Sequence, residues 1–207
     1  MRAKPTADEA RPTLTDWMRA RLGGLVEPIA AFLNRLGLAP NTITILGLTG
    51  NALGAFLLAR GQFLIGGLLV LLMGPVDALD GAMARQRGEA SEFGAFVDSV
   101  TDRYSELLIF GALLAYYAMH DEVLMVGVTF AAAAGSVLVS YIRARAQSLG
   151  FEAKGGLLTR MERYVVLIPS IVLGFPSVGV AIVAVLGNVT ALQRILQVRG
   201  QARRRRG

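Results

Sequence analysis

Apolar residues along the chain gather into six long segments, which short polar links separate. We expect these segments at residues 43–58, 63–83, 93–119, 123–148, 157–173 and 178–196. A helix needs about 20 apolar residues to cross the roughly 30 Å of hydrocarbon in a bilayer, and several segments approach or reach that length. The pattern therefore predicts an all-α integral membrane protein with six transmembrane helices.

The stretch before the first segment has a different pattern. Residues 13–38 mix apolar and charged residues at roughly helical spacing. This is typical of an amphipathic helix that lies in the membrane interface, and a helix packed on the protein's own cytoplasmic face shows the same pattern. We take residues 13–200 as one membrane domain that begins with this interfacial helix, between a flexible N-terminus at 1–12 and a basic tail at 201–207.

The composition agrees with a membrane protein. Of the 207 residues, 54% are hydrophobic, which is more than a soluble domain of this length could bury. The chain has no cysteine. Disulfides, thiolate chemistry and sulfur-ligated metals are therefore excluded.

The formal net charge of +6 comes from basic residues that lie between and beyond the apolar segments. These residues form no stripe of the kind that binds nucleic acid on a soluble fold, so we expect no nucleic-acid partner. Arginine concentrates in alternate links and at both ends of the chain. Because the cytoplasmic loops of membrane proteins carry the excess of Lys and Arg, we expect a multi-pass protein of the cell membrane with both termini and the link at 84–92 in the cytoplasm.

Four aspartates stand at the margins of the second and third segments. Asp77 and Asp80 are three residues apart, and Asp98 and Asp102 are four apart, so each pair shares one face of its helix. The link between the two segments is short and polar, which predicts antiparallel neighbouring helices. We therefore expect all four carboxylates near the cytoplasmic ends of these two helices.

Carboxylates that converge at a membrane interface repel one another and lose hydration, so a cation must accompany them. Oxygen ligands without cysteine or a nearby histidine suit Mg²⁺ or Mn²⁺, and four carboxylates suffice for two ions. Paired metals recur where a phosphorus atom is displaced, because they neutralise the phosphate oxygens and the leaving group together. Two other interpretations remain: helix caps or ion pairs with Arg85, Arg87 or Arg103, and the ion path of a cation-coupled membrane transporter.

Residues 77–102 read DALDGAMARQRGEASEFGAFVDSVTD. The spacing D-x2-D-G-x2-A-R-x8-G-x3-D-x3-D resembles the signature of the CDP-alcohol phosphatidyltransferases, with every fixed position present. The resemblance implies an integral membrane transferase in which the hydroxyl of a small alcohol attacks the β-phosphorus of CDP-diacylglycerol, and CMP leaves. It implies two Mg²⁺ or Mn²⁺ ions per site, Asp102 as the general base, and a metal-binding set of Asp77, Asp80, Asp98 and Asp102.

The same resemblance implies a pocket for the CDP-lipid. The stretch "LAPNTIT" before the first segment is similar to the part of the family that completes this pocket, while Gly81 would permit close contact and Arg85 would meet the pyrophosphate. The residues that carry over are Asn41, Thr42, Ile43, Thr44, Gly81, Arg85 and Ser91. Polar residues at 40–44 are also typical of a helix N-cap.

Arginines at the end of the fourth segment and the start of the fifth bear on the acceptor. The stretches "SYIRARAQSLG" and "GGLLTRMERYVVL" bring together several guanidinium groups, which suit a phosphate. They resemble the subgroup that makes phosphatidylinositol phosphate, and this implies that Arg143, Arg163 and Arg194 bind the phosphate of inositol 1-phosphate. Positive-inside topology and snorkelling explain the same arginines.

Other acceptors and the assembly stay open at this point. Glycerol 3-phosphate, which phosphatidylglycerophosphate synthases use, is the main alternative acceptor, and archaeal relatives that use an ether-lipid donor with the same acceptor are another alternative. Small residues such as those of "FAAAAGS" let transmembrane helices approach closely. They permit a homodimer, and the family resemblance implies one.

Overall fold

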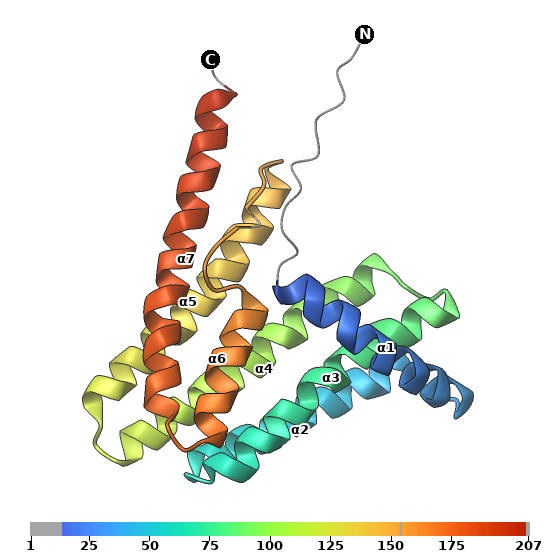
Figure 1. Ribbon diagram of the computed structural model, residues 1–207, viewed down its shortest axis with the longest axis horizontal. Coiled ribbons are helices and arrows are strands. Elements are labelled where there is room, and N and C mark those ends of the chain that lie inside the picture. Colours follow the sequence, from blue (N-terminus) through green and yellow to red (C-terminus); the bar gives the residue numbers. More distant parts are fainter. Residues whose placement is uncertain (1–13, 154, 206–207) are drawn as a thin grey trace.

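The computed structural model describes residues 14–153 and 155–205, and the side chains from residue 24 onward. The expected flexible N-terminus at 1–12 lies outside the described residues. The described residues form seven helices and no strand (Figure 1). The helices are α1 Leu14–Arg35, α2 Pro40–Ala59, α3 Phe63–Arg87, α4 Glu92–Met119, α5 Val123–Ser148, α6 Arg160–Val172 and α7 Pro176–Arg204. The all-α class is therefore confirmed.

Local sequence signals set several helix ends. Pro40 occupies the first turn of α2, where its missing N–H costs no hydrogen bond. Gly88 ends α3 with a φ of 70°, a left-handed conformation that glycine adopts without strain. Ser91 caps α4 by accepting the backbone N–H of Gly94 at 3.0 Å. The turn that carries the chain from α3 to α4 is thus encoded within a few residues.

Within the part of the chain that the structure describes, four helices are long and apolar enough to cross a membrane: α2, α3, α5 and α7. Helix α4 has 28 residues but carries charged side chains at Asp98, Asp102, Arg103 and Glu106. Helix α6 has 13 residues, which is about 20 Å and shorter than the hydrocarbon layer. The prediction of six transmembrane helices is therefore not confirmed for α4 and α6.

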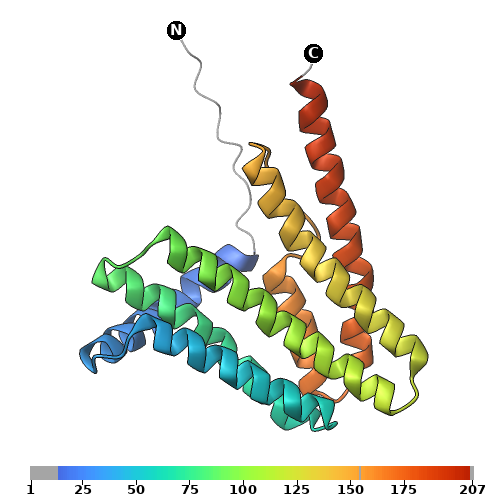
Figure 2. The same ribbon diagram turned by 180° about the vertical axis from the view of Figure 1, so that it is seen from behind.

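Helix α2 is the element that joins the two aspartate helices. It packs along both α3 and α4, whereas α3 and α4 contact each other at few positions. Figure 2 shows α2 and α4 side by side on the face that Figure 1 hides. The expectation that α3 and α4 are neighbouring packed helices is thus wrong, because their short link brings only their ends together and α2 occupies the contact.

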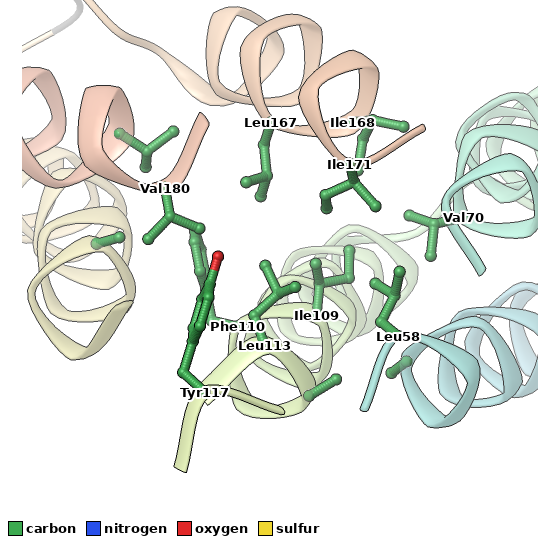
Figure 3. Packing of buried hydrophobic residues seen from close by; sticks show 14 of the residues in the cluster. Leu58, Val70, Ile109, Phe110, Leu113, Tyr117, Leu167, Ile168, Ile171 and Val180 are labelled. Carbon is green, nitrogen blue, oxygen red and sulfur yellow. The ribbon is translucent and has the colours of Figure 1, made fainter. Parts of the chain in front are cut away.

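Helix α6 lies at the centre of the hydrophobic core. Its residues Leu167, Ile168 and Ile171 point toward Val70 of α3 and Ile109 of α4, among other buried side chains (Figure 3). Helix α6 also packs on α7, and α7 runs beside α5. The core therefore fixes the second half of α6, from Leu167 onward, relative to α4.

Helix α1 packs on α3. Val26 and Ala30 of α1 join Met83 of α3 in a second, smaller buried cluster. The opposite face of α1 leaves Leu25 64% and Phe32 59% exposed. Helix α1 thus packs on the protein, as the second interpretation of residues 13–38 expected, and it still presents large apolar side chains outward.

Candidate active site

The two aspartates of α3 face α2. Asp80 Oδ2 accepts a hydrogen bond of 2.5 Å from the hydroxyl of Thr44, and its Oδ1 lies 2.5 Å from the backbone nitrogen of Gly81. Asp77 lies against Gly47, because a Cβ built on Gly47 would come within 2.5 Å of Asp77 Oδ1. Close approach of α2 therefore depends on a glycine at position 47.

The two aspartates of α4 differ in exposure. Asp98 is exposed to solvent, whereas Asp102 is 8% exposed. Asp102 Oδ1 lies 2.6 Å from a terminal guanidinium nitrogen of Arg160 on α6, and its Oδ2 lies 3.4 Å from Arg103. The buried carboxylate is therefore compensated by two arginines.

The four carboxylates come within electrostatic range of one another. Asp77 interacts electrostatically with Asp80 and Asp98, and Asp102 interacts electrostatically with Asp98 and Asp77. Asp98 acts on Asp80 as well. Because α3 and α4 both pack on α2, they present their aspartates to one region although they hardly contact each other.

The chemistry of this donor set suits a hard divalent cation, since it offers only carboxylate and hydroxyl oxygens. Within residues 14–153 and 155–205, no three acidic or histidine side chains gather around one point closely enough to hold a metal. Asp102 is directed to Arg160, and Asp80 is directed to Thr44. Asp102 can therefore bind a metal only if its ion pair with Arg160 is replaced by the bond to the metal.

The N-terminus of α2 carries four of the residues expected in the CDP-lipid pocket. The N-cap of α2 is Ala39, which makes no side-chain cap, so the N-cap interpretation of the polar residues at 40–44 is wrong. Asn41 and Thr42 are exposed, while Ile43 is buried in the cluster that includes Val26 and Ala30 of α1. Thr44 is the member of this group that contacts an aspartate.

The other three expected pocket residues lie at the junction of α3 and α4. Arg85 is exposed, and its charge acts on Asp80. A Cβ on Gly81 would lie 3.3 Å from a terminal nitrogen of Arg85, so this glycine leaves room beside the guanidinium. Ser91 is engaged as the N-cap of α4. An exposed arginine thus stands next to the aspartates of α3.

The three arginines expected to bind the acceptor phosphate lie near one another, since the charges of Arg143 and Arg163 both act on Arg194. Only Arg143 of these three is exposed. Arg163 is 1% exposed and forms a two-point ion pair with Glu106 of α4, with Nε–Oε1 2.7 Å and Nη2–Oε2 3.1 Å. Arg194 is 2% exposed and donates to two backbone carbonyls. In the structure, the two buried guanidinium groups are therefore held by the protein itself.

Three residues of the site were not expected from the sequence: Arg160, Glu106 and Gly47. Glu106 follows Asp102 by four residues, so helical spacing already placed it on the aspartate face of α4. Arg160 precedes Arg163 by three residues, which puts both on one side of α6. No sequence signal distinguishes Gly47 from the other small residues of α2.

Comparison with known proteins identifies the family to which the chain belongs. The sequence model of the CDP-alcohol phosphatidyltransferases matches residues 37–193, which is most of the chain and includes all four aspartates. The phosphatidylinositol phosphate synthase of Streptomyces avermitilis is 38% identical over 216 residues, with 97% of this chain and 87% of that protein covered. The comparisons thus favour a transferase over the cation transporter.

Solved structures agree with the sequence comparison. The Mycobacterium tuberculosis phosphatidylinositol phosphate synthase with CDP-DAG bound has a TM-score of 0.78 and 35% identity, over 84% of this chain and 92% of that one. The same synthase in complex with manganese and citrate has a TM-score of 0.79 and 35% identity, over 84% and 88%. The chain belongs to the CDP-alcohol phosphatidyltransferase family and is a phosphotransferase enzyme of phospholipid biosynthesis.

Proposed function

We propose that this enzyme transfers the phosphatidyl group of CDP-diacylglycerol to a hydroxyl of inositol 1-phosphate, giving phosphatidylinositol phosphate and CMP. The observation that carries the choice of acceptor is a group of arginines that adjoins the aspartates through Arg160, which contacts Asp102, and that includes the exposed Arg143 near Arg194. Guanidinium groups bind phosphate strongly, and an unphosphorylated alcohol needs no such cluster. The phosphatidylinositol phosphate synthases among the relatives support the same choice.

In the proposed reaction, Asp102 takes the proton from the acceptor hydroxyl. The hydroxyl oxygen then bonds to the β-phosphorus of CDP-diacylglycerol, and the bond between that phosphorus and the CMP oxygen breaks. Asp77, Asp80, Asp98 and Asp102 would hold two divalent ions, Mg²⁺ or Mn²⁺, whose positive charge would neutralise the diphosphate oxygens and the leaving CMP. The burial of Asp102 keeps bulk water away from the proton acceptor.

The CDP group is proposed to lie along the start of α2 and the end of α3. Exposed Asn41 and Thr42 supply polar side chains there, and exposed Arg85 supplies a charge for the pyrophosphate. Gly81 leaves room for the nucleotide beside Arg85. Ile43, Thr44 and Ser91 support the pocket indirectly. Ile43 packs in the smaller buried cluster, Thr44 bonds Asp80, and Ser91 caps α4.

The acceptor phosphate is proposed to lie on the side of α6. Arg160 contacts Asp102 directly, so a phosphate held by Arg160 brings the hydroxyl of the same small molecule within reach of the base. Arg143 adds an exposed charge, and Arg163 and Arg194 add positive potential from buried positions. Direct contact of Arg163 with the phosphate requires that its pair with Glu106 open.

The arrangement in the membrane is part of the proposal. Residues 13–200 form one membrane domain in which α2 to α7 serve as six membrane segments and α1 lies in the interface. The apolar side chains that α1 leaves exposed support this position. The termini and the active site face the cytoplasm, where the arginines concentrate. The enzyme acts as a homodimer.

An acceptor panel tests the proposed function. Purified enzyme with CDP-diacylglycerol and Mg²⁺ or Mn²⁺ is given inositol 1-phosphate, inositol or glycerol 3-phosphate, and released CMP is measured. We expect CMP release with inositol 1-phosphate and far less with the other two. CMP release that favours glycerol 3-phosphate would replace the proposed acceptor.

A pair of arginine variants tests the phosphate site. Arg143→Ala is expected to raise the KM for inositol 1-phosphate roughly tenfold or more, because hydrogen bonds to a charged group are lost, with the KM for CDP-diacylglycerol unchanged. Arg145→Ala is the matched control, since it removes the same charge from the exposed end of α5, two residues away. Equal effects of the two variants would reduce the role of Arg143 to general positive charge.

A further inference from the structure

The link between α5 and α6 poses a hydrogen-bonding problem. Residues 149–153 and 155–159 form no regular secondary structure. The N–H groups of residues 149–151 still donate to carbonyls of the last turn of α5, but the described residues after 151 have no helix or sheet of their own to satisfy their backbone groups. Backbone polar groups that are left unpaired near a membrane are costly. Ala153 and Leu158 are nevertheless buried, at 0% and 4% exposure. After Phe151, the partners of this link must therefore come from another element.

Helix α7 supplies those partners near the end of the link. The N–H of Leu158 donates to the hydroxyl of Thr190 at 2.9 Å, and the N–H of Leu157 donates to Gln193 Oε1 at 3.2 Å. Arg194 Nε donates to the carbonyl of Gly155 at 2.9 Å. The second half of the link is thus hydrogen-bonded to one face of α7.

The same face of α7 holds the beginning of the link. Gln201 bonds the backbone of Glu152 at both groups: its Oε1 accepts the N–H at 3.0 Å and its Nε2 donates to the C=O at 2.5 Å. Arg205 donates to the carbonyl of Gly150, and its guanidinium lies 4.2 Å from the ring centre of Phe151. Residues expected as a basic tail therefore contact the protein.

These contacts run in register. The α7 partners recur at helical spacing, and the link runs antiparallel to α7, from Gly150 opposite Arg205 to Leu158 opposite Thr190. Helix α7 rises about 22 Å over this stretch, and residues 150–158 reach at most about 30 Å when fully extended. Helix α7 therefore holds the link in an extended form.

The held link leads directly to the acceptor side of the site. Helix α6 begins at Arg160, two residues after Leu158, and Arg160 contacts Asp102. In the first turn of α6, Arg163 is held by its pair with Glu106, whereas Arg160 has no hydrogen bond to the described residues other than that with Asp102, so a link that loosens from α7 leaves Arg160 less restrained. The position of Arg160 thus depends on the contacts of α7.

We propose that Gln201 and Arg205 are positioning residues for the acceptor site. By holding the α5–α6 link extended along α7, they keep Arg160 at the acceptor side of the aspartate site, and they set the affinity for the phosphorylated acceptor without touching it. This inference rests on the proposed function for the identity of the acceptor. The coupling of α7 to α6 through the link does not depend on the proposed function.

Attraction of the basic C-terminus to anionic lipid is the competing explanation, and it makes a different prediction. If lipid attraction is the role of this end, replacing Arg203 and replacing Arg205 should have the same effect, because each adds one positive charge to the same exposed end of α7. Their contacts differ in the structure: Arg205 contacts the link, and Arg203 makes no side-chain hydrogen bond or ion pair with the described residues. The two arginines therefore form a matched pair.

Kinetics with matched variants tests the proposal. Gln201→Ala and Arg205→Ala are expected to raise the KM for inositol 1-phosphate about 3- to 10-fold, the effect of losing one or two hydrogen bonds that hold Arg160 in place, with the KM for CDP-diacylglycerol unchanged. Arg203→Ala is expected to match wild type. So is Gln197→Ala, because Gln197 packs near Gly155 without a hydrogen bond to the described residues. Equal effects of Arg203→Ala and Arg205→Ala would overturn the proposal in favour of lipid attraction.

Amide hydrogen exchange separates this proposal from the choice of acceptor. Gln201→Ala is expected to speed exchange at the amides of residues 152, 153 and 155–158 at least several-fold, while Gln197→Ala leaves it unchanged. Should inositol 1-phosphate fail as a substrate while the link still loosens, the proposed function is wrong, and the KM comparison moves to the acceptor that is used. Exchange in Gln201→Ala equal to that in Gln197→Ala would overturn the proposal whatever the acceptor.

Discussion

Replacing Glu106 by alanine tests how the structure holds α6 against α4. Arg163 is 1% exposed and Glu106 is 5% exposed, and two hydrogen bonds of 2.7 and 3.1 Å join them. The third contact of the guanidinium is a long one, 3.5 Å, to the carbonyl of Leu158. Without Glu106, Arg163 therefore keeps its charge in the interior with almost no compensation.

The expected cost is large. Removing one partner of a buried ion pair costs about 3 to 5 kcal/mol, because the remaining charge is left without compensation. For a protein of this size, 1 kcal/mol corresponds to roughly 2 to 4 °C in melting temperature, so we expect a drop of about 6 to 20 °C. Glu89→Ala is the control, because it removes an exposed carboxylate and is expected to change the melting temperature little.

Thermal unfolding of the purified protein in detergent measures these changes. A double variant sharpens the test, because Glu106→Leu combined with Arg163→Met replaces the whole pair with apolar groups and is expected to recover much of the lost stability. A Glu106→Ala protein that melts like wild type would refute the reasoning. So would a double variant as unstable as the sum of its single changes.

Three further predictions concern the site. Asp102→Asn is expected to leave a folded protein whose CMP release falls about 10²-fold or more, as the loss of a general base predicts. Gly47→Ala is expected to displace Asp77, so that more Mn²⁺ is needed for half-maximal activity, whereas Gly111→Ala, with nothing within 4 Å of its added Cβ, should behave like wild type. Chelation of divalent ions is expected to abolish CMP release, and Mg²⁺ or Mn²⁺ should restore it.

The sequence predicted the elements well because their signals are local. Apolar runs of membrane length and end signals such as Ser91 and Gly88 act within a few residues, and six predicted segments correspond to α2 to α7. The segment predicted at 157–173 begins later, at Arg160, because the backbone of Leu157 and Leu158 is hydrogen-bonded to α7 and not to a helical turn. That competition could not be read from the segment itself.

The partners of the site residues were harder to predict. Helical spacing alone put Asp98 and Asp102 on one face, but it could not show that Arg163 would be matched with Glu106 and Arg160 with Asp102. Such pairs depend on how α6 is placed against α4, and that placement depends on core packing across distant parts of the chain. Charge pattern predicted a basic cluster, and tertiary contacts decided which of its members are exposed.

The metal centre is the central claim, and counting bound Mn²⁺ tests it most directly. Equilibrium binding to the purified enzyme in the presence of CDP-diacylglycerol should give about two ions per chain. Combined replacement of Asp77, Asp80, Asp98 and Asp102 by asparagine should remove this binding, while Glu89→Gln should leave it intact. Undiminished Mn²⁺ binding by a folded variant that lacks all four carboxylates would contradict the account.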